Sequence, residues 1–292
     1  ANNICKESWD IVKHLTCDEN VNSFNIYLKD KDELITHPSN VANVFNNYFV
    51  SEILKLTGPT VQADVNQNSN HQHDSSDEFI LWPTDEEEVK ETILKVSSKR
   101  GAGVDEIPCS ILKVCKDIIA KPLTIIINKS FQDGYFPNEI KTSKVVPIHK
   151  CNERDQVKQY RPVAVQSVFS KIIEIIFLKR LIPYLEKNKI LNNHQYGFRK
   201  CRSTADAILD LLINLYENLD LVGEQLCIFY DMTKAFDLLS HDVLLKKLLA
   251  IGIRGKPLKW IHSYLKDRKM VVTVRYSGAD GLTRHYRSEV SP

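Results

Sequence analysis

The sequence has no long apolar run, no paired-cysteine motif and no recognisable secretory leader. A membrane-spanning helix needs about 18 or more consecutive apolar residues, and because no such run occurs we expect no membrane span. The first residues carry no basic segment followed by an apolar one, so we expect no secretory signal. The 7 cysteines are odd in number and never spaced as Cys-x-x-Cys. This favours reduced thiols in an intracellular protein over a disulfide framework or a zinc site.

The composition is ordinary, but charge is unevenly distributed along the chain. Hydrophobic residues make up 43% and charged residues 26% of the 292 residues, which excludes a wholly disordered chain, a collagen or a disulfide-stapled miniprotein. The net charge of +2 averages two unlike parts. Residues 1–78 carry 5 Lys and Arg against 12 Asp and Glu, whereas the remainder carries 34 against 25. This asymmetry indicates an acidic leader on a basic body suited to polyanions.

The leader is predicted to contain an amphipathic helix followed by a polar linker. Over residues 41–56 large apolar side chains recur at helical spacing, with Phe45 and Phe49 on one face. Residues 57–78 are rich in Asn, Gln, Ser and Asp, and offer too little apolar surface to offset the entropy of ordering. We therefore predict an acidic helical leader and linker over 1–78 and a second domain over 79–292.

The second domain mixes helices and strands without regular alternation, which predicts an α+β fold. Helix patterns cover residues 110–130, 167–188, 203–217, 240–252 and 257–268. Strand patterns cover residues 144–150, 160–166, 224–232, 270–276 and 282–290, with the first and last pairs read as hairpins. Pro122 is expected to bend or divide the helix over residues 110–130. Thr84 begins a capping-box pattern, which predicts another helix directly after it.

Residues 224–232 are a candidate for the functional centre because an apolar, β-branched and aromatic run ends at Asp231. That pattern is typical of a buried central strand that presents a carboxylate at its C-terminal end. In a basic domain such a carboxylate could hold Mg²⁺, which prefers carboxylate oxygens and substrate phosphates. The alternative is that Asp231 only caps the turn into the next helix.

Two further segments have the composition of phosphate-binding or base-binding sites. Lys150 and Arg161 lie on the predicted hairpin, where Arg suits bidentate phosphate contact and Lys supplies a compact charge. Solvated surface charges are the alternative. Residues 194–204 interleave Tyr196 and Phe198 with cations, a pattern that can stack on bases and neutralise phosphates. The alternative there is a loop whose aromatic rings pack inward while its charges face water.

Six segments, taken in order, resemble the reverse transcriptases of non-LTR (LINE-type) retrotransposons. They are GAGVDEIPCSILK, FQDGYFPNEIKTSKVVPIHK, YRPVAVQSVFSKIIEIIFLKRL, NNHQYGFRKCRSTADAIL, FYDMTKAFDLLSHDVLLKKL and IGIRGKPLKWIHSYLKDRKM. The resemblance covers about residues 79–292, and the leader resembles the stretch between endonuclease and polymerase in such polyproteins. It implies an RNA-directed DNA polymerase, a nucleotidyltransferase with a right-hand fold, of which this chain carries the fingers and the first part of the palm.

The resemblance also implies roles for individual residues. Asp231 matches the first catalytic aspartate, which with the Met232 carbonyl would be a ligand of Mg²⁺ in a two-metal transfer. Lys150 and Arg161 match residues on the incoming triphosphate, and Phe236 matches the bulky residue that selects deoxynucleotides. The implied template and nucleotide pocket comprises Gln195, Gly197, Phe198 and Arg199. The implied partners are an RNA template, a DNA primer and deoxynucleoside triphosphates, and family habit implies a nuclear location.

Two motifs of that family are absent from the 292 residues. The sequence has neither a Gly-x-Pro-Gln-Gly loop nor an Asp-Asp dipeptide, so one carboxylate strand of the two-metal site is missing. We therefore expect a polymerase fragment that binds Mg²⁺ weakly and does not polymerise DNA alone. The alternative is a non-catalytic nucleic-acid-binding or scaffold protein, derived from such an element and retained by a host.

Overall fold

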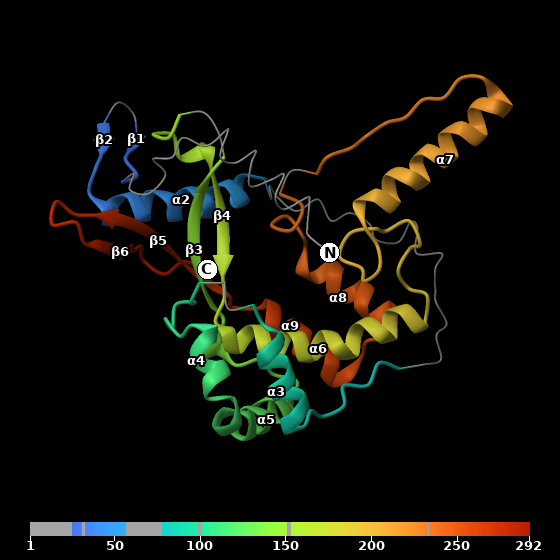
Figure 1. Cartoon of the computed structure of the whole chain (residues 1–292), viewed down its shortest axis with the longest axis horizontal. Helices are drawn as coiled ribbons and strands as arrows, with labels where there is room; N and C mark the ends of the chain where they lie inside the picture. Colours follow the sequence, from blue (N-terminus) through green and yellow to red (C-terminus); the bar gives the residue numbers. More distant parts are fainter. Residues whose placement is uncertain (1–24, 31–32, 57–77, 98–100, 151–152, 233) are drawn as a thin grey trace, which may run out of the picture.

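The computed structural model describes residues 25–30, 33–56, 78–97, 101–150, 153–232 and 234–292. Within these residues a small sheet lies above a body of helices, and one helix projects from the side (Figure 1). This arrangement confirms the α+β class expected from the sequence. The linker predicted over residues 57–78 lies almost wholly outside the described residues. None of the described helices combines the length and apolarity needed to cross a bilayer.

The helical body has one aromatic core. Its helices are α3 (Glu86–Lys95), α4 (Cys109–Val114), α5 (Lys116–Asp133), α6 (Val168–Lys187), α8 (His241–Ala250) and α9 (Gly255–Leu265). The Trp260 ring stacks on Phe177 with 4.3 Å between ring centroids, and its indole Nε1 donates to Ser130 Oγ at 2.9 Å. The core therefore joins α5, α6 and α9 through a buried indole whose polar group has a partner.

The sheet has the strand order β4-β3-β5-β6. Its strands are β3 (Thr142–His149), β4 (Tyr160–Val165), β5 (Lys269–Ser277) and β6 (Thr283–Arg287). The β3–β4 and β5–β6 pairs are antiparallel, which confirms both predicted hairpins. β3 and β5 run parallel, with Thr142 opposite Lys269 at the start of both strands. This parallel pairing joins the two hairpins into one sheet.

The leader helix packs on this sheet. The short strands β1 (Leu28–Asp30) and β2 (Glu33–Ile35) precede α2 (Pro38–Leu56), which confirms the predicted leader helix. The Phe45 ring meets Tyr160 of β4 edge to face at 4.8 Å. The buried Asn46 amide donates to Ser291 Oγ at 2.6 Å. The described part of the leader therefore shares a hydrophobic core with β3, β4 and β5.

Two local predictions are wrong in position. The helix predicted over 110–130 divides at Cys115, which ends α4 and begins α5, rather than at Pro122. Pro122 has no N–H to donate to the carbonyl of Ile118, four residues earlier, so the helix loses only one hydrogen bond there. The Ile118 side chain is exposed, so this turn of the helix faces water. The cap of α3 is Asp85, which accepts from the Glu88 N–H at 2.8 Å, instead of Thr84. Thr84 instead donates its hydroxyl to the Glu88 carboxylate.

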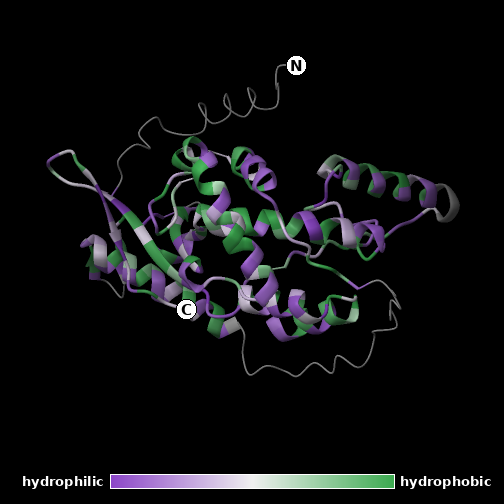
Figure 2. Cartoon of the chain, turned by 90° about the horizontal axis from the view of Figure 1, so that it is seen from below, coloured by the Kyte–Doolittle hydropathy of each residue, from purple (hydrophilic) through white to green (hydrophobic). Residues whose placement is uncertain are grey.

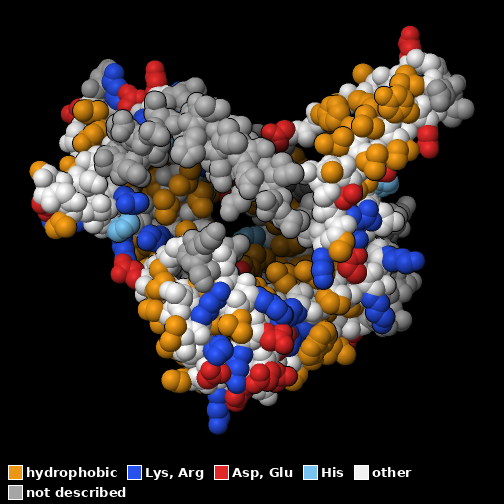
Figure 3. All heavy atoms as spheres, in the orientation of Figure 1, with side chains coloured by type: hydrophobic (Ala, Val, Ile, Leu, Met, Phe, Trp, Pro, Cys, Tyr) orange, Lys and Arg blue, Asp and Glu red, His pale blue; other side chains and the backbone are white. Residues whose placement is uncertain are grey.

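The buried strand expected over residues 224–232 is not formed. Tyr230 is 86% exposed, and within the described residues no strand pairs with this segment. An apolar run becomes a buried strand only when neighbouring strands satisfy its backbone, and composition does not supply those neighbours. The segment instead forms an exposed connection that follows α7 (Thr204–Val222). That helix stands apart from the body (Figure 1). Apolar residues run along its length (Figure 2), and their side chains are exposed (Figure 3).

Candidate functional site

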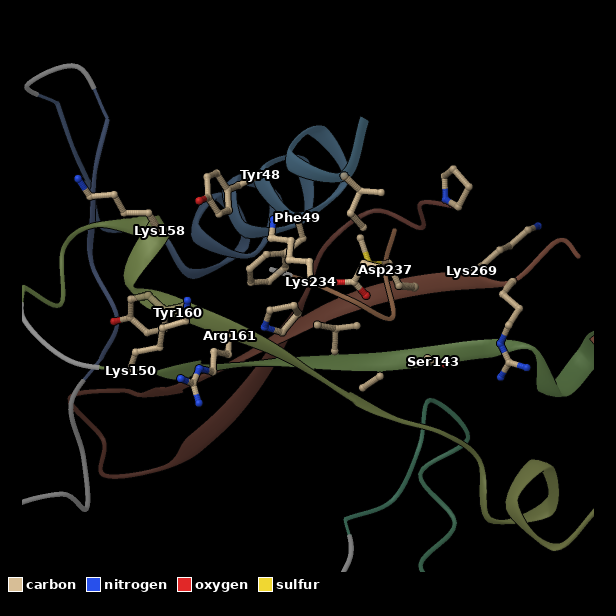
Figure 4. Close-up of a pocket in the computed structure, with 17 residues that line it drawn as sticks. Tyr48, Phe49, Ser143, Lys150, Lys158, Tyr160, Arg161, Lys234, Asp237 and Lys269 are labelled. Carbon is tan, nitrogen blue, oxygen red and sulfur yellow. The ribbon is translucent and has the colours of Figure 1, made fainter. Parts of the chain in front are cut away.

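A basic cavity of about 490 Å³ lies between α2, the sheet and the turn over residues 234–238. Its cationic lining residues are Lys150, Lys158, Arg161, Lys234, Arg268 and Lys269. Lys150, Lys158 and Arg161 gather at one end and Lys269 lies at the other, with Lys234 and Asp237 between them (Figure 4). The cavity therefore has an elongated positive wall, which suits an anion with several charges.

The β3–β4 hairpin brings Lys150 and Arg161 together, as the sequence led us to expect. Arg161 is paired with Ile148 in the ladder, and the Lys150 N–H donates to the Gln159 carbonyl at 2.8 Å just beyond the last paired residues. Both side chains are exposed, and within the described residues neither enters an ion pair. Two such cations on one hairpin can make charge-assisted contacts with one phosphate chain.

The turn over residues 234–238 forms part of the cavity wall. It brings Lys234 and Asp237 into the lining, and its backbone is held by the Asp237 N–H, which donates to the Lys234 carbonyl at 2.9 Å. Lys234 Nζ lies 3.8 Å from Glu52 Oε2 on α2. The leader helix thus reaches the turn directly through an ion pair.

The loop between α6 and α7 holds the four residues expected to form a template and nucleotide pocket. Gln195 and Gly197 are exposed, while the Phe198 ring meets Phe236 edge to face at 5.8 Å. The Arg199 guanidinium binds other protein groups: its Nη2 donates to Glu186 Oε2 at 2.6 Å, and its Nη1 donates to the Asn192 carbonyl. The structure therefore brings Phe198 to the turn, whereas Arg199 anchors the loop to the end of α6.

Asp231 does not lie in the cavity lining. Asp231 and Met232 are exposed on an extended segment ahead of the turn. Within the described part of the chain, no three His, Cys, Asp or Glu residues cluster as a metal site. One carboxylate with one backbone carbonyl supplies too few oxygen ligands for a pair of Mg²⁺ ions. The donor set of the described residues therefore does not fit the two-metal site that the resemblance implies.

Several lining residues were not identified from the sequence. Tyr48 and Phe49 come from the leader, which was predicted to be a separate unit, and Lys158 comes from the short helix η3 (Val157–Gln159). Burial raises the pKa of Tyr48, and the neighbouring Glu52 charge raises it further, so the phenol stays protonated. For Tyr48 and Phe49, the sequence does offer a signal. The leader helix has an apolar face, and such a face is normally buried against another part of the protein.

Comparison with known proteins matches part of the sequence to a family. Residues 148–292 match the family described as "Reverse transcriptase (RNA-dependent DNA polymerase)". The chain is 28% identical over 251 residues to the "Probable RNA-directed DNA polymerase from transposon BS" of Drosophila melanogaster, covering 84% of this chain and 27% of that protein. It is 28% identical over 207 residues to the "RNA-directed DNA polymerase from mobile element jockey" of Drosophila melanogaster. That match covers 70% of this chain and 22% of that protein.

A third relative comes from an element named R1DM. It is the "Putative 115 kDa protein in type-1 retrotransposable element R1DM" of Drosophila melanogaster, 28% identical over 187 residues, or 63% of this chain and 18% of that protein. Residues 148–292 therefore belong to the reverse transcriptase family, and the chain carries a reverse transcriptase domain of the non-LTR retrotransposon type. It spans about a quarter or less of the length of these relatives.

Proposed function

We propose that this chain supplies the fingers and the first part of the palm of an RNA-directed DNA polymerase. In this assignment the basic cavity receives the triphosphate of an incoming deoxynucleotide, with Lys150 and Arg161 on the phosphates. The observation that supports it most directly is the convergence of Lys150, Lys158, Arg161 and Lys234 on one cavity. Lys234 already lies beside Glu52, whereas Lys150, Lys158 and Arg161 would repel one another less with an anion bound among them.

Each side chain has a defined part in that proposal. Lys150 and Arg161 neutralise the triphosphate, and Arg161 can contact it with two parallel N–H groups. Phe236 lies beside the sugar and disfavours a 2′-hydroxyl, and its contact with Phe198 keeps the ring in place. Template RNA and primer DNA would pass along the same basic face. The nuclear location implied by the family remains a prediction.

A titration with a fluorescent deoxynucleoside triphosphate tests the nucleotide site. Loss of a charge-assisted hydrogen bond costs roughly 1.5–3 kcal/mol, so Lys150→Ala and Arg161→Ala should each weaken binding by about tenfold or more. The matched control is Lys95→Ala, which removes an exposed charge from α3, far from the lining in sequence. Equal affinities for all four proteins would exclude the cavity as the triphosphate site.

Catalysis is proposed to need more than Asp231. Because no cluster of three metal-ligating side chains forms within the described residues, we infer that a polypeptide of these 292 residues binds nucleotide without extending a primer. A primer-extension assay on an RNA template with Mg²⁺ tests this directly, with Asp231→Ala as the control. Sustained extension that disappears in Asp231→Ala would show that the site is complete.

A further inference from the structure

The far end of the cavity carries a second pair of cations, Arg268 and Lys269. Lys269 opens β5 and lies opposite Thr142, the first residue of β3, whereas Lys150 directly follows the last residue of β3. At about 3.3 Å per residue, these two ends of the strand are roughly 25 Å apart along the backbone. Three phosphates joined by single bridging oxygens cannot extend between the two ends. A triphosphate bound at the Lys150 end therefore leaves Arg268 and Lys269 available to a different anion.

Arg268 is held rigidly at that end. Its Nη1 donates to the Tyr264 carbonyl at 3.2 Å, and its guanidinium lies 4.5 Å from the centre of the Tyr264 ring. With the Gln166 amide oxygen turned toward it, Nη2 donates to that oxygen at 2.9 Å. These contacts use two of the five N–H donors of the guanidinium, which leaves three for a ligand. An arginine fixed in this way loses little side-chain entropy when it binds phosphate.

A partly buried carboxylate sets the orientation of this arginine. Glu174 lies in α6 behind Gln166, accepts from Ser170 Oγ at 2.9 Å, and accepts from the Gln166 amide nitrogen at 3.1 Å. Because the Gln166 nitrogen is engaged by Glu174, the oxygen of the same amide must face Arg268. Glu174 is therefore a positioning residue that acts on Arg268 through Gln166.

We propose that Arg268 and Lys269 form a subsite for a backbone phosphate of a nucleic-acid strand, at the end of the cavity opposite the triphosphate. The inference rests on the proposed function, because it treats the Lys150 and Arg161 end as the place of the incoming nucleotide. The ligand chemistry is a phosphate group, which either a nucleic-acid strand or a second free nucleotide could supply. Gln166 and Glu174 position Arg268 for this contact.

Two titrations separate these sources, one with a short single-stranded RNA and one with the fluorescent triphosphate. Arg268→Ala should weaken RNA binding by about tenfold and leave triphosphate binding within about twofold, whereas Lys150→Ala should mainly weaken triphosphate binding. Loss of one phosphate contact should also reduce the slope of log affinity against log salt by about 0.7. The matched control is Lys266→Ala, which removes a charge from the same turn but not from the lining.

The positioning role has its own readout. Glu174→Gln should weaken RNA binding by about threefold in the unaltered chain and have no effect in the Arg268→Ala background. A structural effect of Glu174 would persist in both backgrounds. If Arg268→Ala affects RNA no more than Lys266→Ala, or affects the triphosphate as much as RNA, the subsite is overturned. An unaltered chain that binds triphosphate but not RNA overturns the subsite alone, whereas one that binds neither overturns the proposed function as well.

Discussion

The rings of Phe198 and Phe236 meet edge to face, with 5.8 Å between centroids and 87° between their planes. They are 91% and 78% exposed, so the contact lies on the surface. Phe198 belongs to the loop after α6 and adopts a positive φ of 61°, a conformation that a non-glycine residue rarely holds without support. The contact thus connects a strained loop to the turn that carries Lys234 and Asp237.

Removing the Phe198 ring should loosen this turn. In Phe198→Ala the Asp237 and Leu238 amides, which both donate to the Lys234 carbonyl, should exchange with solvent deuterium several-fold faster. The physical reason is that an edge-to-face pair contributes about 0.5–1.5 kcal/mol, most of which acts locally. Hydrogen-exchange mass spectrometry of the peptide covering the turn measures the effect. The control is Tyr216→Ala, an exposed ring on α7, and equal acceleration by both variants would contradict the coupling.

Arg180 should be the most costly charged residue to remove from the helical body. Its side chain is 1% exposed, and its Nη2 donates to Glu88 Oε2 at 2.8 Å and its Nε to the Trp82 carbonyl at 2.7 Å. Arg180→Ala removes the guanidinium that pairs with Glu88 and the donor of the Trp82 carbonyl, so unfolding free energy should fall by about 3–5 kcal/mol. Urea denaturation measures it. Lys95→Ala, which breaks the exposed pair with Glu91, should cost less than about 0.5 kcal/mol.

Acid should destabilise the protein through Glu88. Burial alone would raise the pKa of Glu88, but hydrogen bonds from Arg180 and Thr84 and the charges of Arg180 and Lys179 outweigh it and lower the pKa to about 2. A depressed carboxylate pKa contributes stability above its ordinary value of 4.5, and that contribution is lost as pH falls toward 2. Urea midpoints between these values should therefore decline more steeply for the unaltered chain than for Glu88→Gln.

Glu174 should have the opposite pH dependence. Burial raises the pKa of Glu174, an effect only partly opposed by the Ser170 hydrogen bond and the Arg268 charge. A raised carboxylate pKa favours the folded state at low pH, and this contribution is lost as pH rises through the folded-state pKa. Glu174→Gln should therefore gain stability relative to the unaltered chain as pH increases from 4.5 toward neutrality. A constant difference between the two urea midpoints across that range would refute the assignment.

Substitution of an isoleucine should destabilise the protein much more in the packed body than in the projecting helix α7. Ile173 in α6 is 1% exposed, whereas Ile213 in α7 is 46% exposed. Ile173→Ala should lower the free energy of unfolding by about 2–5 kcal/mol because it leaves a cavity. Ile213→Ala should change it by less than about 0.5 kcal/mol. The same urea experiment measures both, and similar losses for the two variants would show that α7 is packed in solution.

Local sequence patterns predicted most of the individual elements. Two strand patterns over residues 144–150 and 160–166, joined by a short charged loop, identified the β3–β4 hairpin, and with it the approach of Lys150 to Arg161. Ser203 was placed at the start of a helix, and the structure shows it there in a capping box with Asp206. These features depend on neighbours in the sequence, so periodicity and capping chemistry suffice to find them.

Features that depend on distant residues could not be predicted in this way. Nothing in the pattern of residues 269–277 indicates that Lys269 pairs with Thr142, because a parallel pairing leaves no local turn signature. The failure at residues 224–232 has the same origin, since burial of a strand is a property of its neighbours. The place of Tyr48 in the cavity likewise required the packing of α2 on the sheet.

The bond between Asn46 and Ser291 joins residues separated by 245 positions in the chain. During synthesis at about 5–20 residues per second, α2 emerges roughly 10–50 s before the segment that completes its binding surface. Through that interval the apolar face bearing Phe45 and Phe49 has no β5 to pack against. The leader can therefore reach its final position only after the segment that contains Ser291 has been made.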